Sequence, residues 1–249
     1  MTQVKVNPVG KIAFVSGSNR GIGKAITIEL LEKGAQKVYA GARNVSKLDK
    51  LKQQYGDRLV PVQLDVTDSN SIAKAASQVE DLDILVNNAG VASWGKILSE
   101  DVNSSLTENL KVNVWGLVNL SNAFINQLKK GNPTAIVNFS SVAGLANMPV
   151  ASTYSVSKAA VHSITQGMRG ELANDNVLVM GVYPGPIDTD MAAGVEAEKD
   201  SPENVASNLL QGLMDGVEDM FPDVMSKQVG EFYSSSPKAL EQQFAGYAK

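Results

Sequence analysis

Cysteine is absent from the 249-residue sequence, and histidine occurs once, as His162. The lack of cysteine excludes disulfides, thiol nucleophiles and thiolate ligands, and one histidine cannot build a histidine-rich metal cluster. We therefore expect no metal site. The sequence also lacks the apolar run of a signal peptide and any stretch long enough to span a bilayer. These absences predict a cytoplasmic protein with no membrane partner.

Positive charge is not in excess either. The 22 lysine and arginine residues are outnumbered by 26 aspartate and glutamate residues, giving a formal net charge of -4. Nucleic-acid-binding proteins present basic patches, so nucleic acid is not an expected partner. Hydrophobic residues make up 43% of the chain, enough to bury one sizeable core, and residues 1–249 are expected to form a single domain.

Apolar runs alternate with helical patterns along the chain. The runs are mostly unbroken, as in strands covered on both faces. They lie at 11–16, 37–42, 59–65, 82–88, 135–141 and 177–183, with a short last strand near 219–221. Helical patterns lie at 22–33, 46–55, 69–80, 104–129, 154–173 and 201–217. This order predicts an α/β fold, a doubly wound parallel sheet of the Rossmann type with six to seven strands and helices on both faces.

A glycine-rich turn, GSNRGIG, follows the first predicted strand and opens a helix. In open parallel sheets, ligands bind at the carboxyl ends of the strands, and free N–H groups at a helix start attract phosphate. The turn could also be a plain tight turn, because its spacing is not the usual dinucleotide fingerprint. Its position favours a dinucleotide site. The predicted contacts are Gly17, Asn19, Arg20, Gly21, Ile22 and Gly23.

The end of the second strand indicates which dinucleotide is bound. An acidic residue there would accept bonds from the ribose hydroxyls and repel a 2′-phosphate. Ala42 stands at about that place and Arg43 follows it. Arg43 and Arg20 could clamp a 2′-phosphate, although both could be solvated surface arginines. We therefore expect NADP(H) rather than NAD(H).

Two more strand ends supply candidate contacts. Asp65 could accept a bond from the adenine amino group or cap the following helix, as Asp68 also could. The stretch NNAG ends the fourth strand; its asparagines could tie neighbouring strands together, and its small residues leave room for a ribose. The predicted cofactor contacts here are Asp65, Val66, Asn88, Ala89 and Gly90.

The stretch YSVSK places Tyr154 and Lys158 four residues apart, on one face of a predicted helix. An ammonium beside a phenol lowers the pKa of the phenol, which can then exchange a proton with a substrate oxygen. A hydroxyl of Ser140 or Ser141, at the end of the fifth strand, could hold that oxygen. Alone, such a pair is most often surface decoration; beside a nicotinamide site it predicts catalysis.

Asn113 interrupts the apolar stripe of the predicted helix 104–129. A buried amide needs hydrogen-bond partners. It could bond to nearby backbone, or it could mark a kink that holds a water and passes protons from Lys158 to solvent. Ala160, Ser163, Gly167 and Gly170 form a stripe of small side chains on the helix 154–173. The stripe either reflects low side-chain bulk or allows a symmetry-related helix to approach.

The motifs SGSNRGIG, NNAG, NFSSVAG, YSVSK and YPGPIDTDM, in this order, resemble those of the short-chain dehydrogenases/reductases. The resemblance runs from about Lys11 to Met191 and departs slightly at Ser16, where threonine is commoner. It implies that Asn113, Ser141, Tyr154 and Lys158 form a catalytic tetrad, with Lys158 also binding the nicotinamide ribose. It implies further cofactor contacts at Pro184, Gly185, Ile187 and Thr189.

The same resemblance implies a variable substrate-binding lid over residues 190–217, expected to be mobile when empty, and a homo-dimer or homo-tetramer. The terminal strand and glycine-rich end of the family are not obvious here. Arg43 resembles the basic residue of NADP(H)-preferring members. His162 is expected to be a surface or interface side chain. Candidates for an apolar pocket wall are Trp94, Met148, Met191 and Val195.

The expected function is NADPH-dependent reduction of a ketone or aldehyde to an alcohol, with Tyr154 as the acid/base and a small carbonyl or alcohol as substrate. A reductase of acyl-carrier-bound 3-oxo substrates is an alternative. A non-catalytic NADP(H) sensor is another, disfavoured by the presence of both Tyr154 and Lys158. Halohydrin dehalogenation on the same scaffold is disfavoured by the intact glycine turn and by Lys158.

Overall fold

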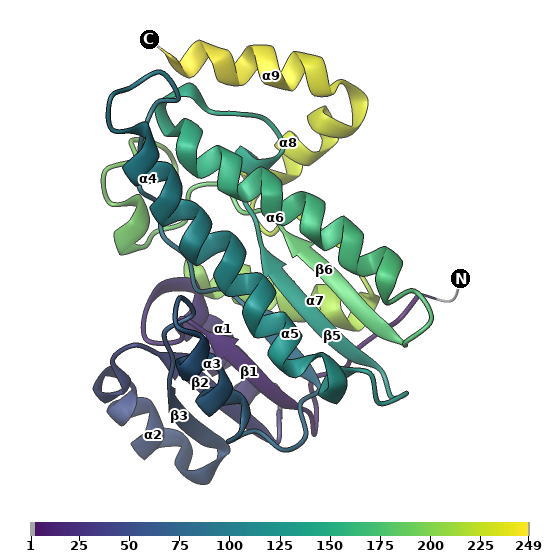
Figure 1. The fold of residues 1–249 in the computed structure, drawn as a ribbon. Helices are drawn as coiled ribbons and strands as arrows, with labels where there is room; N and C mark the ends of the chain where they lie inside the picture. The colour runs from purple at the N-terminus through teal and green to yellow at the C-terminus, as the bar shows by residue number, and fades with distance from the viewer. Residues whose placement is uncertain (1–2, 249) are drawn as a thin grey trace.

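A computed structural model of the chain describes residues 3–248 and contains one parallel sheet of seven strands (Figure 1). The strands lie in the order β3-β2-β1-β4-β5-β6-β7, so the direction of winding reverses between β1 and β4. A crevice forms at such a switch point, outside the carboxyl ends of the two strands. The strands are β1 Ile12–Ser16, β2 Lys37–Ala42, β3 Leu59–Gln63, β4 Ile84–Asn87, β5 Thr134–Phe139, β6 Val177–Val182 and β7 Asp219–Met220.

Helices cover both faces of the sheet. One core cluster packs α1, α2 and α7 against the sheet, and the other packs α3 and α5 against the opposite face. In Figure 1, α5 and α6 lie in front of the sheet and α7 behind it. These helices are α1 Gly21–Glu32, α2 Asp49–Tyr55, α3 Ser69–Ala76, α4 Val102–Asn109, α5 Leu117–Leu128, α6 Ser152–Glu171 and α7 Pro202–Asp215. The predicted doubly wound parallel sheet is confirmed.

The helix predicted over 104–129 is not continuous. Between α4 and α5 the chain forms a π-helix, η3 Leu110–Gly116, with Asn113 at its centre. Asn113 bonds there to the backbone of Val91, which is the first of the two alternatives that the sequence left open. A π-helix widens the turn by one residue and re-aims side chains, and such bulges occur frequently at functional sites. The extra residue shifts the faces of α4 and α5 relative to each other, which a single apolar stripe did not reveal.

The C-terminal part contains two helices that the sequence analysis missed, α8 Val224–Ser235 and α9 Pro237–Ala245. Helix signals were present: Asp223 caps α8 by accepting from the Ser226 N–H at 2.8 Å, and Ser236 caps α9, which begins with proline. The two helices pack over residues 142–148, where Val142 joins Val229, Leu240 and Phe244 in one apolar cluster. They therefore support the loop that follows Ser141.

The segment 190–217 has two unlike parts. Its first part is a short turn, η6 Asp190–Ala192, followed by irregular chain. Its second part is α7, whose residues Val205, Leu209 and Leu213 are fully buried in the core shared with α1. The first part and the first turn of α7, at Pro202 and Glu203, adjoin the crevice at the switch point. Within residues 3–248, no helix combines the length and the apolar character needed to cross a membrane.

Candidate active site

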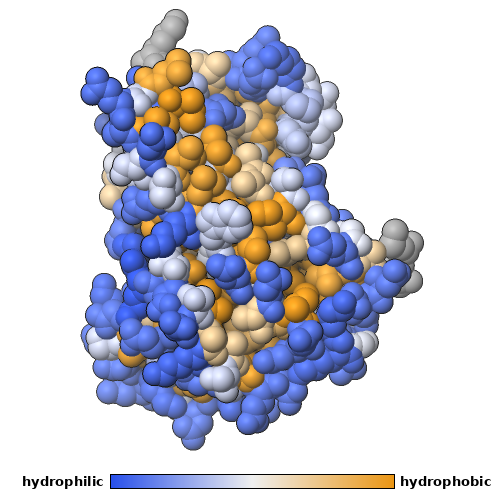
Figure 2. Space-filling model, viewed as in Figure 1, coloured by the Kyte–Doolittle hydropathy of each residue, from blue (hydrophilic) through white to orange (hydrophobic). Residues whose placement is uncertain are grey.

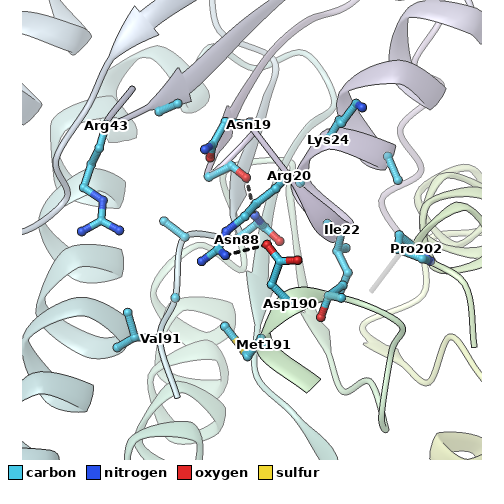
Figure 3. Close-up of a pocket in the computed structure, with 18 of the residues that line it drawn as sticks. Asn19, Arg20, Ile22, Lys24, Arg43, Asn88, Val91, Asp190, Met191 and Pro202 are labelled. Carbon is cyan, nitrogen blue, oxygen red and sulfur yellow. Dashed lines mark hydrogen bonds and ion pairs between the residues drawn. The ribbon is translucent and has the colours of Figure 1, made fainter. Parts of the chain in front are cut away.

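A cavity of about 500 Å³ opens at the switch point between β1 and β4 (Figure 3). It extends from the end of β2, past the glycine turn, to the end of β4 and the segment after β6. Thirteen of the predicted cofactor-binding residues line it: Gly17, Asn19, Arg20, Gly21, Ile22, Gly23, Arg43, Asp65, Val66, Asn88, Ala89, Gly90 and Thr189. The structure thus gathers into one cavity residues that are far apart in the sequence.

The glycines of the turn are required by its own packing. Gly17 has φ 73° and Gly21 has φ 51°, a left-handed conformation that other residues rarely adopt. A Cβ on Gly23 would lie 2.3 Å from the Gly17 carbonyl oxygen and 2.4 Å from Asn88 Nδ2. The tight turn aims the start of α1 at the cavity, and no side chain caps this helix N-terminus. Its free N–H groups suit a bound phosphate.

Ser16 and Asn88 hold the two strands of the switch point together. The Ser16 hydroxyl donates to the Val86 carbonyl and accepts from the Asn88 and Ala89 backbone N–H groups, the last two at 3.0 Å. The Asn88 side chain donates to the Ser16 carbonyl at 2.8 Å. The Ser16 hydroxyl and the Asn88 side chain therefore tie the ends of β1 and β4 together, as the sequence analysis suggested for the asparagines of NNAG.

The two arginines predicted to clamp a 2′-phosphate do not converge. Arg43 projects from the end of β2, while Arg20 turns the other way and pairs with Asp190 at 2.8 Å (Figure 3). Asp65 does not cap α3; Asp68 does, by accepting from the Asn70 N–H. Hydrogen bonds from the Thr67 backbone and hydroxyl to Asp65 hold the pKa of that carboxyl below its usual range.

Tyr154 and Lys158 lie on the first two turns of α6, as the spacing predicted. The Lys158 ammonium lies 5.6 Å from the centroid of the Tyr154 ring and donates to the Phe139 carbonyl at 2.7 Å. The Ser141 hydroxyl reaches Tyr154 and also donates to the Pro184 carbonyl at 3.3 Å. The three side chains therefore meet at the carboxyl end of β5, although Tyr154 and Lys158 do not line the cavity itself.

The direction of the Tyr154 pKa differs from the sequence-based expectation. Burial raises the pKa of the Tyr154 phenol to about 12, and only hydrogen bonding with Ser141 opposes the rise. Burial also lowers the pKa of Lys158 to about 8. The expectation was wrong because it treated the ammonium as a fully charged neighbour of the phenol oxygen. The structure places the lysine over the ring, hydrogen-bonded to backbone, in a site that disfavours charge.

Asn113 is fully hydrogen-bonded. Its amide oxygen accepts from the Val91 N–H at 2.8 Å, and its amide nitrogen donates to the Val91 carbonyl and to the Ser157 hydroxyl, each at 2.9 Å. A Cβ on Gly90 would lie 3.2 Å from the Asn113 oxygen and 3.8 Å from Lys158 Nζ. Asn113 and Lys158 therefore meet around Gly90, next to the cavity.

Three predicted contacts in the segment after β6 do not line the cavity. Pro184 accepts from Ser141, Gly185 donates its N–H to Asp223 at 2.9 Å, and Ile187 is buried. Thr189 does reach the glycine turn, since a Cβ on Gly21 would lie 3.1 Å from its methyl group.

Several residues that line the cavity were not among the predicted cofactor contacts: Lys24, Leu64, Thr67, Val112, Asp190 and Pro202. Lys24 could have been found from its place beside Gly23 in the first turn of α1.

Comparison with known proteins identifies the class. The family model described as short chain dehydrogenase matches residues 11–200. The chain therefore belongs to the short-chain dehydrogenase/reductase family and is an oxidoreductase of that family, which confirms the resemblance noted in the sequence.

Relatives and solved structures agree with this. An oxidoreductase of Staphylococcus epidermidis is 34% identical over 210 residues, covering 82% of this chain and 90% of the relative. A short chain dehydrogenase of Monascus purpureus is 32% identical over 230 residues, 84% of this chain and 78% of its own. The structure of a short chain dehydrogenase from Burkholderia cenocepacia in complex with NADP superposes with a TM-score of 0.89 at 33% identity, covering 96% of this chain and 99% of that one.

Proposed function

We propose that the protein reduces a ketone or aldehyde to an alcohol with NADPH. The observation that carries this proposal is the meeting of Tyr154, Lys158 and Ser141 beside a cavity that begins at an uncapped helix N-terminus. An oxidoreductase needs a proton donor near the carbon that receives hydride, and these three side chains provide one at the same sheet edge as the dinucleotide site.

Several features favour NADP(H) as the cofactor. The end of β2 carries Arg43 and no carboxylate at Ala42, so nothing there repels a 2′-phosphate. The structure of the Burkholderia cenocepacia relative, at 33% identity, is a complex with NADP. The structure of an alcohol dehydrogenase from Thermococcus sibiricus is a complex with 5-hydroxy-NADP. It is 26% identical, covers 85% of this chain and 95% of its own, and superposes with a TM-score of 0.75. Arg43 and the start of α1 would hold the cofactor phosphates.

The bound cofactor would supply the hydride. Tyr154 would donate its phenolic proton to the carbonyl oxygen, and its raised pKa keeps that proton in place at neutral pH. The Ser141 hydroxyl, within reach of the phenol, would orient the same oxygen. Lys158, when charged, would stabilise the phenolate left behind, and Asn113 would act on Lys158 by fixing the backbone beside Gly90.

Replacement of Tyr154 by phenylalanine tests this proposal. The variant should bind NADPH as the wild type does but lose about 100- to 10,000-fold in kcat on a panel of small ketones, because the proton donor is gone. Tyr55→Phe, at a tyrosine bonded to Glu32 on the far side of α1, is the matched control. Turnover of Tyr154→Phe at the wild-type rate would refute the proposal; NADPH binding without any turnover in the wild type would favour a sensor.

We also propose that residues 190–200 cover the substrate, whereas α7 anchors the segment. The turn η6 carries Met191, which is 41% exposed and lines the cavity, while α7 is packed in the core. Closure of such a cover would exclude water from the reacting atoms.

Assembly through α4, α5 and α6 is the third part of the proposal. Figure 2 shows apolar surface on the face that carries these helices. Leu110, Val118, Ile164 and Met168 are partly exposed around a small apolar cluster there, and Trp115 is 60% exposed. A Cβ on Gly167 or Gly170 would meet nothing within 4 Å, so the stripe of small residues lies open. A second copy of the chain, related by a two-fold axis, would cover this face in a homo-dimer or homo-tetramer.

A further inference from the structure

Trp94 stands beside the proposed proton donor. The centroids of the Trp94 and Tyr154 rings are 5.8 Å apart, with 44° between the ring planes. Trp94 is nevertheless 50% exposed, so much of the indole is left uncovered. A large aromatic side chain half open to solvent next to a reacting phenol is well placed to receive part of a substrate.

The backbone on the N-terminal side of Trp94 is held by a buried amide, Asn109, at the end of α4. Its side-chain oxygen accepts from the Ser93 N–H at 3.0 Å, and its nitrogen donates to the Ser93 carbonyl at 2.7 Å. The Thr153 hydroxyl donates to the same carbonyl at 3.0 Å. Both Asn109 and Thr153 have no exposed surface. The Asn109 side chain thus bonds both the N–H and the carbonyl of Ser93, as the backbone of a neighbouring β-strand would.

This arrangement repeats one turn further along the helix. Asn113 makes the same two bonds to Val91 that Asn109 makes to Ser93. On the C-terminal side of Trp94, the Gly95 carbonyl accepts from the Thr153 N–H at 3.1 Å. A Cβ on Gly95 would lie 2.5 Å from the Ser105 hydroxyl oxygen. The backbone is therefore fixed on both sides of Trp94, which places the indole beside the Tyr154 ring.

Other apolar side chains are exposed on the segments around this point. Large exposed apolar side chains of the described residues include Trp94, Ile97, Leu98, Val150 and Met191. Trp94, Ile97 and Leu98 belong to the fixed loop, Val150 to the turn that leads into α6, and Met191 to the proposed cover. Of these, Trp94 is the side chain that contacts Tyr154, and an exposed apolar group beside a reacting centre indicates a binding site for an apolar ligand.

We propose that Trp94, positioned by Asn109, forms the wall that binds a flat apolar group of the substrate, and that the enzyme prefers aryl ketones and aryl aldehydes. The inference rests on the proposed reductase function. Aromatic rings stack on indole in offset or tilted geometries, and a ring so placed would hold its attached carbonyl toward Tyr154 and Ser141. Asn109 would act only through Trp94 and is a positioning residue.

Kinetics with matched substrates test the wall. Wild type should have a kcat/KM for acetophenone about tenfold above that for cyclohexyl methyl ketone, which has the same size but no flat ring. Trp94→Ala should lose about tenfold on acetophenone and less than about twofold on hydroxyacetone, whereas Trp94→Phe should keep most of the activity. Trp115→Phe, at the other tryptophan, is the control: it keeps an aromatic side chain on the proposed assembly face and should change kcat/KM for none of the ketones. Equal losses on all three ketones, or none in Trp94→Ala, would overturn the inference.

Asn109→Leu tests the positioning role. It should raise KM for acetophenone about tenfold while KM for NADPH and kcat for hydroxyacetone stay near wild type, because only the wall has moved. A uniform loss of kcat on every substrate would instead assign Asn109 a purely structural role. Should Asn109→Leu fail to fold, the Trp94 series decides the inference.

A binding measurement separates this inference from the proposed function. In the Trp115→Phe background, Trp94 is the one remaining tryptophan of the chain. Benzamide resembles an aryl ketone and is not reduced by hydride, so with NADP⁺ it should quench or shift Trp94 emission at a lower concentration than cyclohexanecarboxamide. A fluorescence response to benzamide without turnover of any ketone would refute the reductase proposal and support the aryl-binding site. Turnover of ketones without a response to benzamide would support the reductase proposal and refute the aryl-binding site.

Discussion

The Arg20 guanidinium and the Asp190 carboxylate form an ion pair of 2.8 Å across the mouth of the cavity (Figure 3). The pair joins the glycine turn to η6, segments that are 170 residues apart in the sequence. Both side chains are more than half exposed, 56% and 74%, so the pair stabilises the molecule by no more than about 1 kcal/mol. Such a pair can be exchanged for a phosphate contact at low cost.

Asp190→Asn should therefore strengthen NADPH binding. Removal of the carboxylate frees Arg20 for the cofactor phosphates, and we expect Kd to fall about two- to fivefold at low salt. The gain should disappear near 0.5 M salt, where exposed charges are screened. Isothermal titration calorimetry at the two salt concentrations measures both effects.

Asp188→Asn is the matched control for that change. It removes the same charge from the lining of the same cavity, but Asp188 does not pair with Arg20. Tighter NADPH binding by both variants to the same degree would attribute the effect to net charge rather than to release of Arg20.

Arg43→Ala should weaken NADPH much more than NADH. Loss of a charge-assisted bond to a phosphate is worth about 2 kcal/mol, so KM for NADPH should rise about 30-fold. KM for NADH, which has no 2′-phosphate, should change less than about twofold. Lys52→Ala, at a half-exposed lysine of α2 that pairs with Asp57, should leave both values unchanged. A parallel rise for the two cofactors would contradict this role of Arg43.

The reduction rate should fall as the pH rises above about 8. Lys158 has a pKa lowered to about 8, so its ammonium, which would stabilise the departing phenolate, is lost above that pH. Tyr154, with a pKa near 12, keeps its proton through the same range. Alcohol oxidation needs the phenolate instead and should have its optimum at higher pH.

Initial rates of both reactions between about pH 6 and pH 10 check this sign. Profiles of kcat/KM for the two directions that coincide, or a reduction rate that keeps rising above pH 8, would show that the environment of Lys158 differs from the one described here.

Asn113→Ala should destabilise the fold by about 3 kcal/mol. The change leaves the Val91 N–H, the Val91 carbonyl and the Ser157 hydroxyl without their partner in a buried place, and each unpaired group costs about 1–3 kcal/mol, with partial relief from water. Denaturant unfolding measures the loss, and hydrogen exchange should show faster exchange at the Val91 amide. Asn122→Ala, at an exposed position of α5, should change stability by less than about 0.5 kcal/mol.

Gly167→Arg should dissociate the proposed oligomer without unfolding the subunit. A side chain at this position meets nothing within 4 Å inside the chain, so only a neighbouring copy would be displaced. Gly167→Ala is the control and should raise subunit stability by about 1 kcal/mol, since alanine favours a helix interior. Light scattering coupled to gel filtration gives the mass of each variant; an unchanged mass for Gly167→Arg would exclude assembly through this face.

Local patterns predicted most of the fold. Each of the six apolar runs became a strand because both faces of a parallel sheet are covered, so most side chains of the strands are apolar. The pattern over 104–129 did not reveal η3, because the π-helix depends on the bonds of Asn113 to a segment elsewhere in the chain. The helices α8 and α9 were missed although Asp223 and Ser236 carried the capping signals.

The candidate site, like the fold, has features that the sequence predicted and features that only the structure revealed. Motif order and spacing were enough to find Tyr154, Lys158, Ser141 and the glycine turn, since the turn lies within one segment and α6 keeps residues four apart on one face. The pKa of Tyr154 could not be inferred from that spacing, because it depends on how completely the surrounding chain excludes water. Asn109 gave no signal of its role, since its partner Ser93 lies on another element.

The sequence by itself therefore determined the family, the succession of strands and helices along the chain and the candidates for the reactive side chains, all of which follow from local periodicity and motif spacing. Tertiary structure alone decided that Arg20 pairs with Asp190 rather than joining Arg43, that burial governs Tyr154 and Lys158, and that Trp94 is held beside the phenol. The physical reason is that each of these depends on which distant segments meet and how much water remains between them.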